Sequence, residues 1–329
     1  MKVARLHGPG DIRLGDEPVP VPGPGESLVR VTAVGLCGSD LHWYGEGGIG
    51  DSTLDSPLVV GHEFAGVVEG GPRDGQRVAV DPAIACGTCD TCRTGYRNLC
   101  PDVVFAGHGT RDGGLREYVA WPNELLHQIH DECGDAEGAL LEPLCVALHA
   151  MDLAHVRLGA RVAVIGCGPI GLMLVQAVLA AGAGHVVAAD PLPHRLAAAR
   201  GFGADSDAVS QEADVVFEVS GTDAAVEAAL RVARPGARVV LIGIPDEDRT
   251  TFPASLARRK GLTLMLARRA NEGYPRAIDL VRRGVVDVAS LVTARYPLDR
   301  AADAFADAKK RGGLKVIVEP TPPRIRSAG

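Results

Sequence analysis

Hydrophobic and polar positions in the first third of the chain form short β-prone runs separated by turn residues. The runs 26–35 (ESLVRVTAVG), 58–70 (LVVGHEFAGVVEG) and 76–82 (QRVAVDP) are rich in Val, and Pro and Gly fill the preceding segment 18–25. Such runs, bounded by Gly and Pro, are typical of antiparallel strands. We therefore predict a mostly antiparallel, barrel-like β domain.

The hydrophobic pattern changes at residue 161. RVAVIG (161–166) and HVVAAD (185–190) are continuous apolar runs, and an apolar helical stretch lies between them at 172–183. Continuous apolar strands that alternate with helices predict a parallel sheet covered by helices on both faces. The same alternation continues with strands at 214–221, 237–244 and 261–267 and a helix at 222–233.

One connection in this second region is unusually short. Only about eight residues lie between 205 and the strand that begins at 214. A crossover between parallel strands usually needs a dozen or more. We therefore expect the sheet to lack a strand and a helix at this point.

The chain is long enough for two domains. Its 329 residues exceed the usual size of a single domain. The last part reads as a helix at 298–311 and a strand at 314–319, which we expect to return to the first domain. The predicted division is 1–147 completed by 292–329, and 148–291.

Composition narrows the range of partners. The net charge of −7 argues against nucleic acid or an anionic membrane as a general partner. The first residues contain no apolar signal region, and no apolar run is long enough to span a bilayer. The expected location is the cytoplasm.

Four cysteines are clustered within fifteen residues. Cys86, Cys89, Cys92 and Cys100 are separated by turn residues. Four thiolates with no open position are typical of structural zinc. An iron–sulfur site is the competing interpretation, and disulfides are disfavoured in a large chain without an export signal.

A second candidate metal site contains different donors. Cys37 and His62 flank a glycine-rich loop, and Glu63 follows the histidine. A thiolate, an imidazole and a carboxylate suit a catalytic zinc with one open position. Glu142 is a further candidate, since it lies in an otherwise apolar helical run (136–156), interrupted near Pro143, where an unpaired charge is costly.

The second region carries a dinucleotide-binding fingerprint. Gly166, Gly168 and Gly171 form GxGxxG between a strand and a helix, with Pro169 and Ile170 inside the motif. These glycines permit a tight turn and close approach of a pyrophosphate to the helix N-terminus.

The cofactor preference rests on two residues after this fingerprint. Asp190 ends the next strand, where it accepts from ribose hydroxyls and repels a 2′-phosphate, so NAD is favoured over NADP. Arg195 offers a partner to such a phosphate, but we expect it to be an exposed helix residue.

Taken together, these motifs resemble the zinc-dependent medium-chain alcohol dehydrogenases, and most closely their sorbitol (polyol) dehydrogenase branch. The resemblance extends from residue 1 to about 319. It rests on CGSDLHWY, GGIGD, GHEFAG, the four-cysteine lobe, EPLCVALHA, the GxGPIG turn and GGLKVIVE. It implies a GroES-like β-barrel catalytic domain and a Rossmann doubly wound parallel-sheet cofactor domain.

The resemblance implies roles for the metal-site residues. Cys37 and His62 are similar to the first two ligands of the catalytic zinc. Glu142 stands where many alcohol dehydrogenases have a second cysteine, and the polyol branch shares this glutamate. One of Glu63 and Glu142 is expected to bind zinc, with Glu63 favoured, and the other to hold the zinc water. Asp40 resembles the carboxylate that orients the ligand histidine.

The resemblance also implies residues for proton transfer and substrate binding. Ser39 is similar to the hydroxyl that takes the substrate proton, and His42 to the histidine at the end of the relay. Trp43 and Phe105 lie where pocket aromatics are expected. Arg268 resembles an arginine that binds polyol hydroxyls, although Arg269 replaces the tyrosine usually found next to it.

The expected activity is oxidation of a secondary alcohol of a polyol or sugar-like compound to a ketone, with NAD and zinc. The nearest alternatives are L-threonine 3-dehydrogenase, a cyclitol or amino-cyclitol dehydrogenase, and sugar C1 oxidation. A more distant alternative is a non-catalytic protein that binds zinc and nucleotide, for which a basic patch would be needed. The resemblance further implies a homo-oligomer, either a dimer or a tetramer.

Overall fold

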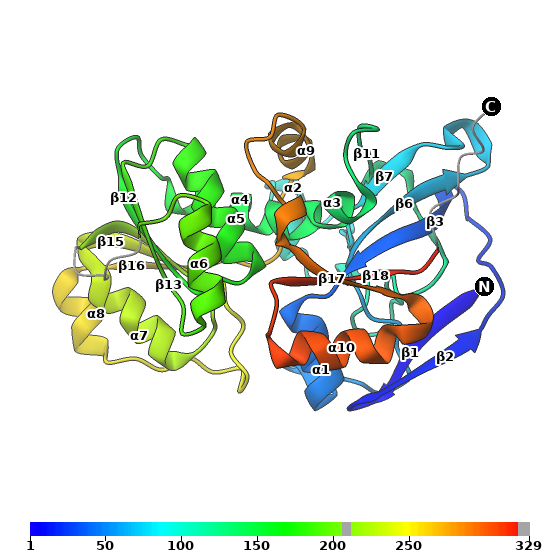
Figure 1. The fold of residues 1–329 in the computed structure, drawn as a ribbon, viewed down its shortest axis with the longest axis horizontal. Helices are drawn as coiled ribbons and strands as arrows, with labels where there is room; N and C mark the ends of the chain where they lie inside the picture. Colours follow the sequence, from blue (N-terminus) through cyan, green and yellow to red (C-terminus); the bar gives the residue numbers. More distant parts are fainter. Residues whose placement is uncertain (206–211, 322–329) are drawn as a thin grey trace. The chain divides into compact units, whose positions relative to one another are not determined.

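The computed structural model describes residues 1–205 and 212–321. The chain divides into two compact units (Figure 1). The first unit comprises Met1–Glu142 and the segment from Ala289, and the second comprises Pro143–Val288.

The first unit contains most of the strands. In chain order these are β1 (Lys2–Gly8), β2 (Asp11–Asp16), β3 (Glu26–Gly35), β4 (Gly48–Ile49), β5 (Ser52–Thr53), β6 (Glu63–Glu69), β7 (Arg77–Val80), β8 (Ala83–Ile84), β9 (Val104–Phe105), β10 (Tyr118–Pro122), β11 (Leu126–Gln128), β17 (Val292–Pro297) and β18 (Lys315–Glu319). Its helices are α1 (Gly38–Glu46), α2 (Asp90–Arg93), α3 (Asp135–Ala139) and α10 (Ala301–Lys310).

The main sheet of this unit is organised around β3. The strand order is β11-β7-β6-β3-β18-β17, and β10 also pairs with β3. All these pairs are antiparallel except β17 with β18. Residues 29–35 of β3 are all buried, because the strand has neighbours on both edges and α3 packs against it. The predicted β-prone run is therefore a strand that is buried on both faces over residues 29–35.

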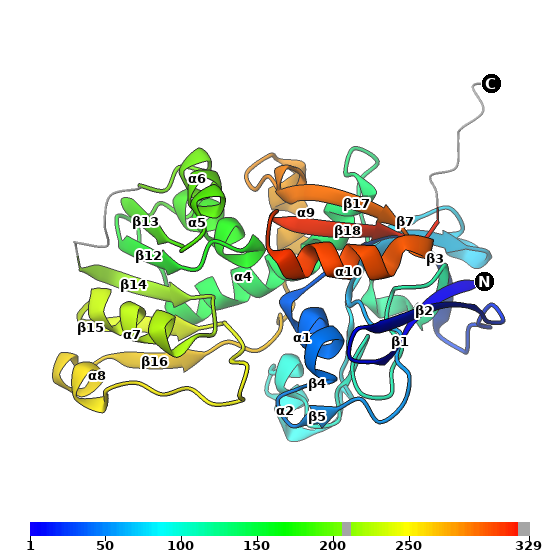
Figure 2. The ribbon, with the colours of Figure 1, turned by 60° about the horizontal axis from the view of Figure 1, so that its bottom comes forward.

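The C-terminal helix and strand belong to the first unit, as predicted from the sequence. The antiparallel register places Ile317 of β18 opposite Gly35 of β3. Helix α10 packs against β17 and β18 (Figure 2). Residues more than 250 positions apart in the sequence thus become neighbours beside β3.

The second unit is a parallel sheet with helices. Its strands are β12 (Arg161–Ile165), β13 (His185–Ala189), β14 (Ala213–Glu218), β15 (Ala233–Leu241) and β16 (Thr263–Leu266). Its helices are α5 (Pro169–Ala180), α6 (Pro193–Gly201), α7 (Asp223–Val232), α8 (Ala254–Lys260) and α9 (Tyr274–Arg282), and most of α4 (Leu141–Ala154) belongs here.

The sheet order β13-β12-β14-β15-β16 reverses direction at β12, and every pair in it is parallel. Helix α5 packs against α6, and α7 packs against α8 (Figures 1 and 2). Because such crossovers are right-handed, the two helix pairs cover opposite faces of the sheet. This is the doubly wound arrangement, with its ligand-binding edge at the carboxyl ends of β12 and β14.

The short crossover predicted after residue 205 lies mainly in 206–211, which is outside the described residues. Among the described residues no strand intervenes between β13 and β14, and Asp205 makes a single parallel bridge with Val187.

The helix predicted at 136–156 is interrupted, but not at Pro143. The break falls at Leu140, between α3 and α4. Pro143 lies in the first turn of α4, where backbone N–H groups have no intrahelical acceptor, so the helix loses nothing by the lack of an N–H at proline. Within the ranges 1–205 and 212–321, none of the helices has the length and apolarity needed to cross a bilayer.

Candidate functional site

The four clustered cysteines converge as a single metal site. The Sγ atoms of Cys86 and Cys92 are 4.0 Å apart, and those of Cys89 and Cys100 are 3.9 Å apart. A tetrahedral site with Zn–S bonds of about 2.3 Å has S–S edges of about 3.8 Å, so the cluster fits zinc. All four cysteines are free of disulfides.

Backbone amides stabilise thiolate in this lobe. Cys89 N donates to Cys86 Sγ and Cys92 N donates to Cys89 Sγ, both at 3.4 Å. Hydrogen bonds from the backbone at Thr88 and Cys89 lower the pKa of Cys86 to about 6. Thiolate is the form that binds zinc, so the lobe is a structural zinc site.

The second metal site is assembled from two segments of the first unit. Cys37 follows β3 and is the N-cap of α1, whereas His62 immediately precedes β6 and Glu63 begins it. One donor atom from each of the three residues lies within 4.8 Å of the other two. A thiolate, an imidazole and a carboxylate at this spacing fit zinc with a position left for a further ligand.

Asp40 connects two of these donors. Its Oδ2 accepts a hydrogen bond from Cys37 N (2.9 Å), which closes the first turn of α1, and its Oδ1 lies 3.4 Å from His62 Nδ1. Although burial disfavours the ionised carboxyl, the charge of His62 keeps the pKa of Asp40 below its usual value. Asp40 therefore holds Nδ1 and leaves Nε2 of His62 for a metal.

The surroundings of His62 favour positive charge. Burial opposes protonation of the imidazole, but the charges of Asp40 and Cys37 outweigh it and hold the pKa of His62 well above its usual range. This attraction for a cation is a second reason to accept zinc at the site.

Glu63 is paired with a buried lysine. Lys315 Nζ lies 2.6 Å from Glu63 Oε2 and 2.8 Å from Oε1, and it also donates to the Leu36 carbonyl at 2.9 Å. The side chains of Lys315 and Glu63 are only 3% and 1% exposed. A Cβ at Gly35, which is opposite Glu63 in the sheet, would overlap the carboxylate. Gly35 therefore leaves room for this pair.

Glu142 lies outside the converging donors but within their electrostatic reach. It is buried near the start of α4. Burial, followed by the charges of Glu63 and Asp81, raises the pKa of Glu142 to about 7, while His62 and Lys315 oppose the shift. Of the two glutamates, Glu63 is the one grouped with Cys37 and His62.

The predicted relay and pocket residues also lie in this unit. Ser39 is buried in the first turn of α1, and His42 is partly buried one turn later, with Nδ1 3.3 Å from Glu46 Oε1. Trp43 is fully buried. The ring of Phe105 lies 5.3 Å from that of His62, between centroids.

The dinucleotide fingerprint adopts the turn that its glycines predict. Gly166 has φ +103° after β12, Gly168 is the N-cap of α5, and Pro169 and Ile170 begin the helix. A Cβ at Gly171 would overlap the Gly166 carbonyl. The backbone therefore makes a tight strand-to-helix turn with the helix N-terminus open to an anion.

Asp190 and Arg195 both adjoin this turn. Asp190 accepts hydrogen bonds from Cys167 N (2.7 Å) and Leu192 N (2.8 Å). Arg195 is partly buried rather than exposed, and its Nη1 lies 3.8 Å from where a Gly168 Cβ would be. The expectation that Arg195 is an ordinary exposed helix residue is therefore wrong. Arg268 lies in the second unit, exposed beyond the end of β16.

Two residues of the metal site were missed from the sequence. Lys315 is a charged residue at the start of the apolar strand β18, which is a usable signal because a buried lysine needs an anionic partner. His108 packs against His62 with ring centroids 5.6 Å apart. It has no characteristic spacing to another donor, so the sequence offered no signal for it.

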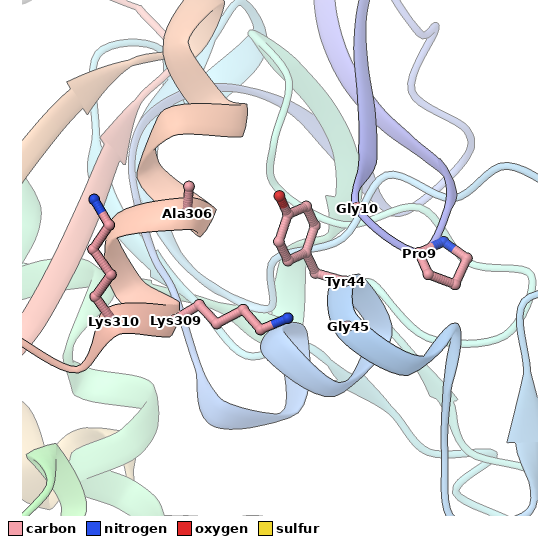
Figure 3. A pocket seen from close by; sticks show the side chains of 7 residues that line it. All are labelled: Pro9, Gly10, Tyr44, Gly45, Ala306, Lys309 and Lys310. Atoms are coloured by element: carbon pink, nitrogen blue, oxygen red, sulfur yellow. The ribbon is translucent and has the colours of Figure 1, made fainter.

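A shallow cavity of about 420 Å³ lies elsewhere in the first unit, beside Tyr44, Lys309 and Lys310 (Figure 3). The two lysine amino groups point in different directions in Figure 3 and do not converge on one point. This cavity therefore lacks the grouped polar atoms of a binding site.

Comparison with known proteins identifies the family. Residues 23–131 match the alcohol dehydrogenase GroES-like domain, and residues 169–283 match the zinc-binding dehydrogenase family. A sorbitol dehydrogenase of Bacillus subtilis is 35% identical, with 97% of each chain covered.

Solved structures of dehydrogenases have the same fold as this chain. L-idonate 5-dehydrogenase of Escherichia coli superposes with a TM-score of 0.91 at 29% identity, covering 97% of both chains. An alcohol dehydrogenase of E. coli CFT073, complexed with NADH, gives a TM-score of 0.88 at 28% identity and covers 97% of this chain and 99% of that one.

The predicted α/β class, with a GroES-like domain and a Rossmann-like parallel sheet, is thus confirmed. With its two zinc sites, the protein is an oxidoreductase that acts on alcohols or polyols with a nicotinamide cofactor. The chain belongs to the zinc-binding medium-chain alcohol dehydrogenase family.

Proposed function

We propose that the protein oxidises a secondary alcohol of a polyol or sugar-like substrate to a ketone, with NAD as the hydride acceptor. The observation that carries the proposal is the Cys37–His62–Glu63 donor set in a chain 35% identical to a sorbitol dehydrogenase over almost its full length. Glu142, which stands where many alcohol dehydrogenases have a second cysteine, is a further feature that resembles the polyol branch.

Cys37, His62 and Glu63 would hold the catalytic zinc, with Asp40 fixing His62. When bound, zinc polarises the alcohol oxygen and NAD accepts the hydride. The pairing of Glu63 with Lys315 compensates one of the two anionic ligand charges, which would preserve the electrophilic character of the site. Glu142, whose pKa is raised to about 7, would hold the water or hydroxyl beside the ligands.

The proton lost by the alcohol needs a route away from the buried site. Ser39, buried at the start of α1 beside the ligand Cys37, would relay it, with Oγ taking up the alcohol proton as its own hydroxyl proton passes on. His42 would pass it onward, since an imidazole takes up a proton on one nitrogen and releases one from the other, and Nδ1 of His42 lies 3.3 Å from Glu46 Oε1. Ser39 and His42 would therefore act in series.

NAD rather than NADP is proposed as the cofactor. Asp190 directly follows β13, and its carboxylate lies beside the turn, where it would repel a 2′-phosphate. Solved relatives take either cofactor, because the one from E. coli CFT073 is complexed with NADH and one from Sinorhizobium meliloti 1021 is bound to NADP, so the choice rests on Asp190. Arg195 is the residue that would favour a phosphate.

The cytoplasmic location also stays a prediction.

We propose a homo-oligomer, a dimer or a tetramer, as the functional form. β16 is one of the two outer strands of the described parallel sheet, and Leu266 on it is 79% exposed. An outer strand offers backbone groups for pairing with a second copy. Light scattering after size exclusion should give a mass above one chain, with Leu266→Glu shifting it downward; a monomeric wild type would refute this part.

A variant pair tests the activity. Cys37→Ala should abolish sorbitol-dependent NAD reduction while NADH binding, followed by fluorescence, persists. Cys133→Ala is the matched control, because this thiol is outside both metal clusters, and it should behave as wild type. Turnover retained by Cys37→Ala would overturn the proposed metal site.

A further inference from the structure

A histidine outside the metal ligands lies against the two aromatic residues that are expected to line the substrate pocket. The ring of His108 is 5.6 Å from that of Trp43 and 5.1 Å from that of Phe105, between centroids, and both contacts are edge-on. It is also 5.6 Å from the His62 ring. His108 therefore places an imidazole among the two pocket aromatics and the ligand histidine.

His108 is not an additional metal ligand. The donor atoms that converge at this site come from Cys37, His62 and Glu63, and His108 is not grouped with them. Its ring is partly buried, on a turn between β9 and β10. Its location fits contact with a substrate held beside the metal.

The turn that carries His108 is rigidly attached to the segment before His62. Gly107 N donates to the Arg111 carbonyl at 2.8 Å, and Arg111 N donates to the His108 carbonyl at 3.1 Å. Gly107 has φ +71°, and a Cβ there would lie 2.9 Å from Gly61 N. Only glycine allows this approach, which brings His108 next to the His62 segment.

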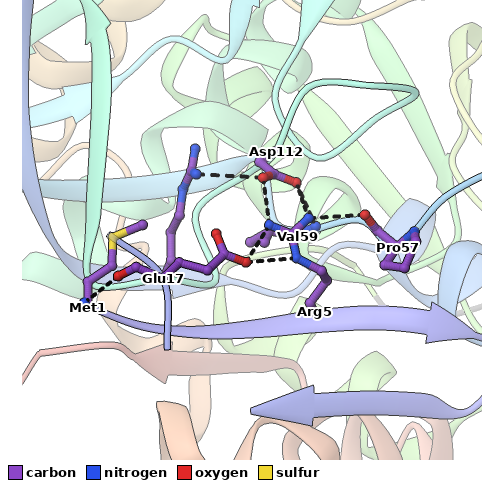
Figure 4. Close-up of polar contacts among 7 residues, drawn as sticks. Met1, Arg5, Glu17, Pro57, Val59 and Asp112 are labelled. Atoms are coloured by element: carbon purple, nitrogen blue, oxygen red, sulfur yellow. Dashed lines mark hydrogen bonds and ion pairs between the residues drawn. The ribbon is translucent and has the colours of Figure 1, made fainter. Parts of the chain in front are cut away.

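An ion-pair network fixes the far side of the same turn. Asp112 receives hydrogen bonds from both terminal nitrogens of Arg5, each at 2.9 Å, and from Val59 N at 3.0 Å (Figure 4). Gly114 N then donates to the Gly61 carbonyl at 2.7 Å. The imidazole is thus held in place before any substrate arrives, as a binding group should be.

The chemistry of the group matches a hydroxyl. A neutral imidazole has one nitrogen that donates a hydrogen bond and one that accepts. A substrate hydroxyl can also donate and accept, so either nitrogen can bind it. The two side chains next to His108, Trp43 and Phe105, are aromatic. The buried indole N–H of Trp43 has no acceptor in the described part of the chain. A polyol offers an oxygen to such groups, whereas an alcohol with a single hydroxyl at the metal does not.

We propose that His108 is a specificity-determining residue that hydrogen-bonds a second hydroxyl of the polyol, next to the carbon being oxidised. The inference rests on the proposed polyol activity and deepens it. A site built to hydrogen-bond a substrate hydroxyl discriminates strongly against an analogue that lacks it. His108 therefore selects for polyols over simple secondary alcohols.

The test compares two substrates in three variants. His108→Phe keeps an aromatic ring but no hydrogen bond, His108→Asn keeps hydrogen-bonding capacity, and His130→Phe is an exposed control outside the site. For each, kcat and KM are measured with NAD for sorbitol and for 2-pentanol, which has one hydroxyl.

We expect His108→Phe to lower kcat/KM for sorbitol about tenfold or more, mainly through KM, and to change that for 2-pentanol less than about twofold. His108→Asn should recover part of the loss, and His130→Phe should match wild type. An equal loss for both substrates would make His108 a packing residue and overturn the inference, as would no loss at all. The wild-type arm tests the proposed function separately: 2-pentanol activity without sorbitol activity would overturn both proposals.

Discussion

The pairing of Lys315 with Glu63 makes a quantitative prediction about zinc and stability. Replacing Lys315 by Met removes one partner of an ion pair whose side chains are at most 3% exposed. Breaking such a buried pair costs about 3–5 kcal/mol, because the remaining charge is left uncompensated. The metal-free protein should lose stability by this amount.

Zinc should reduce that loss. If Glu63 binds the metal, the cation takes over the compensation that Lys315 provided, so the variant should lose less stability with zinc than without it. By linkage, the difference appears as tighter zinc binding, about tenfold for each 1.4 kcal/mol. Lys315→Met should therefore be less stable than wild type but hold zinc more tightly.

The measurement is denaturant unfolding of wild type and variant, each zinc-loaded and metal-free, with zinc affinity from competition against a chelator. Arg30→Met is the matched control, because it breaks the Arg30–Glu69 pair (2.7 Å) in the same sheet, away from the metal donors. The loss of unfolding free energy in Arg30→Met should be the same in the zinc-loaded and the metal-free protein, within the scatter of the measurement. Equal losses for Lys315→Met with and without zinc would refute the assignment of Glu63 as a ligand.

Three further predictions follow from other parts of the structure. Burial and the charge of Arg73 lower the pKa of His127 to about 4, so the contribution of neutral His127 to stability is full above pH 6.5 and is lost as the pH falls toward 4. His127→Gln should flatten this decline in the free energy of unfolding, measured at several pH values. An unchanged pH profile would contradict the assignment. Cys92→Ser should remove one zinc per chain by metal analysis yet leave the metal at Cys37, whereas loss of all zinc would show that the two sites depend on one another. Asp190→Asn should raise the affinity for NADPH relative to NADH about tenfold in fluorescence titrations, because the charge that repels a 2′-phosphate is gone, and an unaltered ratio would assign the preference to other residues.

The parts of the site that the sequence predicted are those encoded locally. The four cysteines and the glycine turn at 166–171 each lie within one short stretch of the chain. Their chemistry depends on spacing along the chain. His62 and Glu63 could be recognised in the sequence for the same reason, since they are adjacent.

Contacts set by strand register could not be predicted in this way. Lys315 and Glu63 are separated by 252 residues and meet because β18, β3 and β6 are neighbours in the sheet. His108 meets His62 through a turn whose glycines pack on the segment 59–61. Arg195 is drawn toward Gly168 by the packing of α6 near α5. Hydrophobic periodicity indicates strands and helices but not which of them become neighbours.

The most direct test of the account is the rate of NAD reduction with a panel of sorbitol, xylitol, inositols, L-threonine and glucose, with and without a zinc chelator. The account predicts activity on the alditols that the chelator abolishes and added zinc restores. Activity confined to threonine, a cyclitol or glucose would contradict the polyol assignment. Alditol oxidation that survives complete removal of zinc would contradict the role of Cys37, His62 and Glu63.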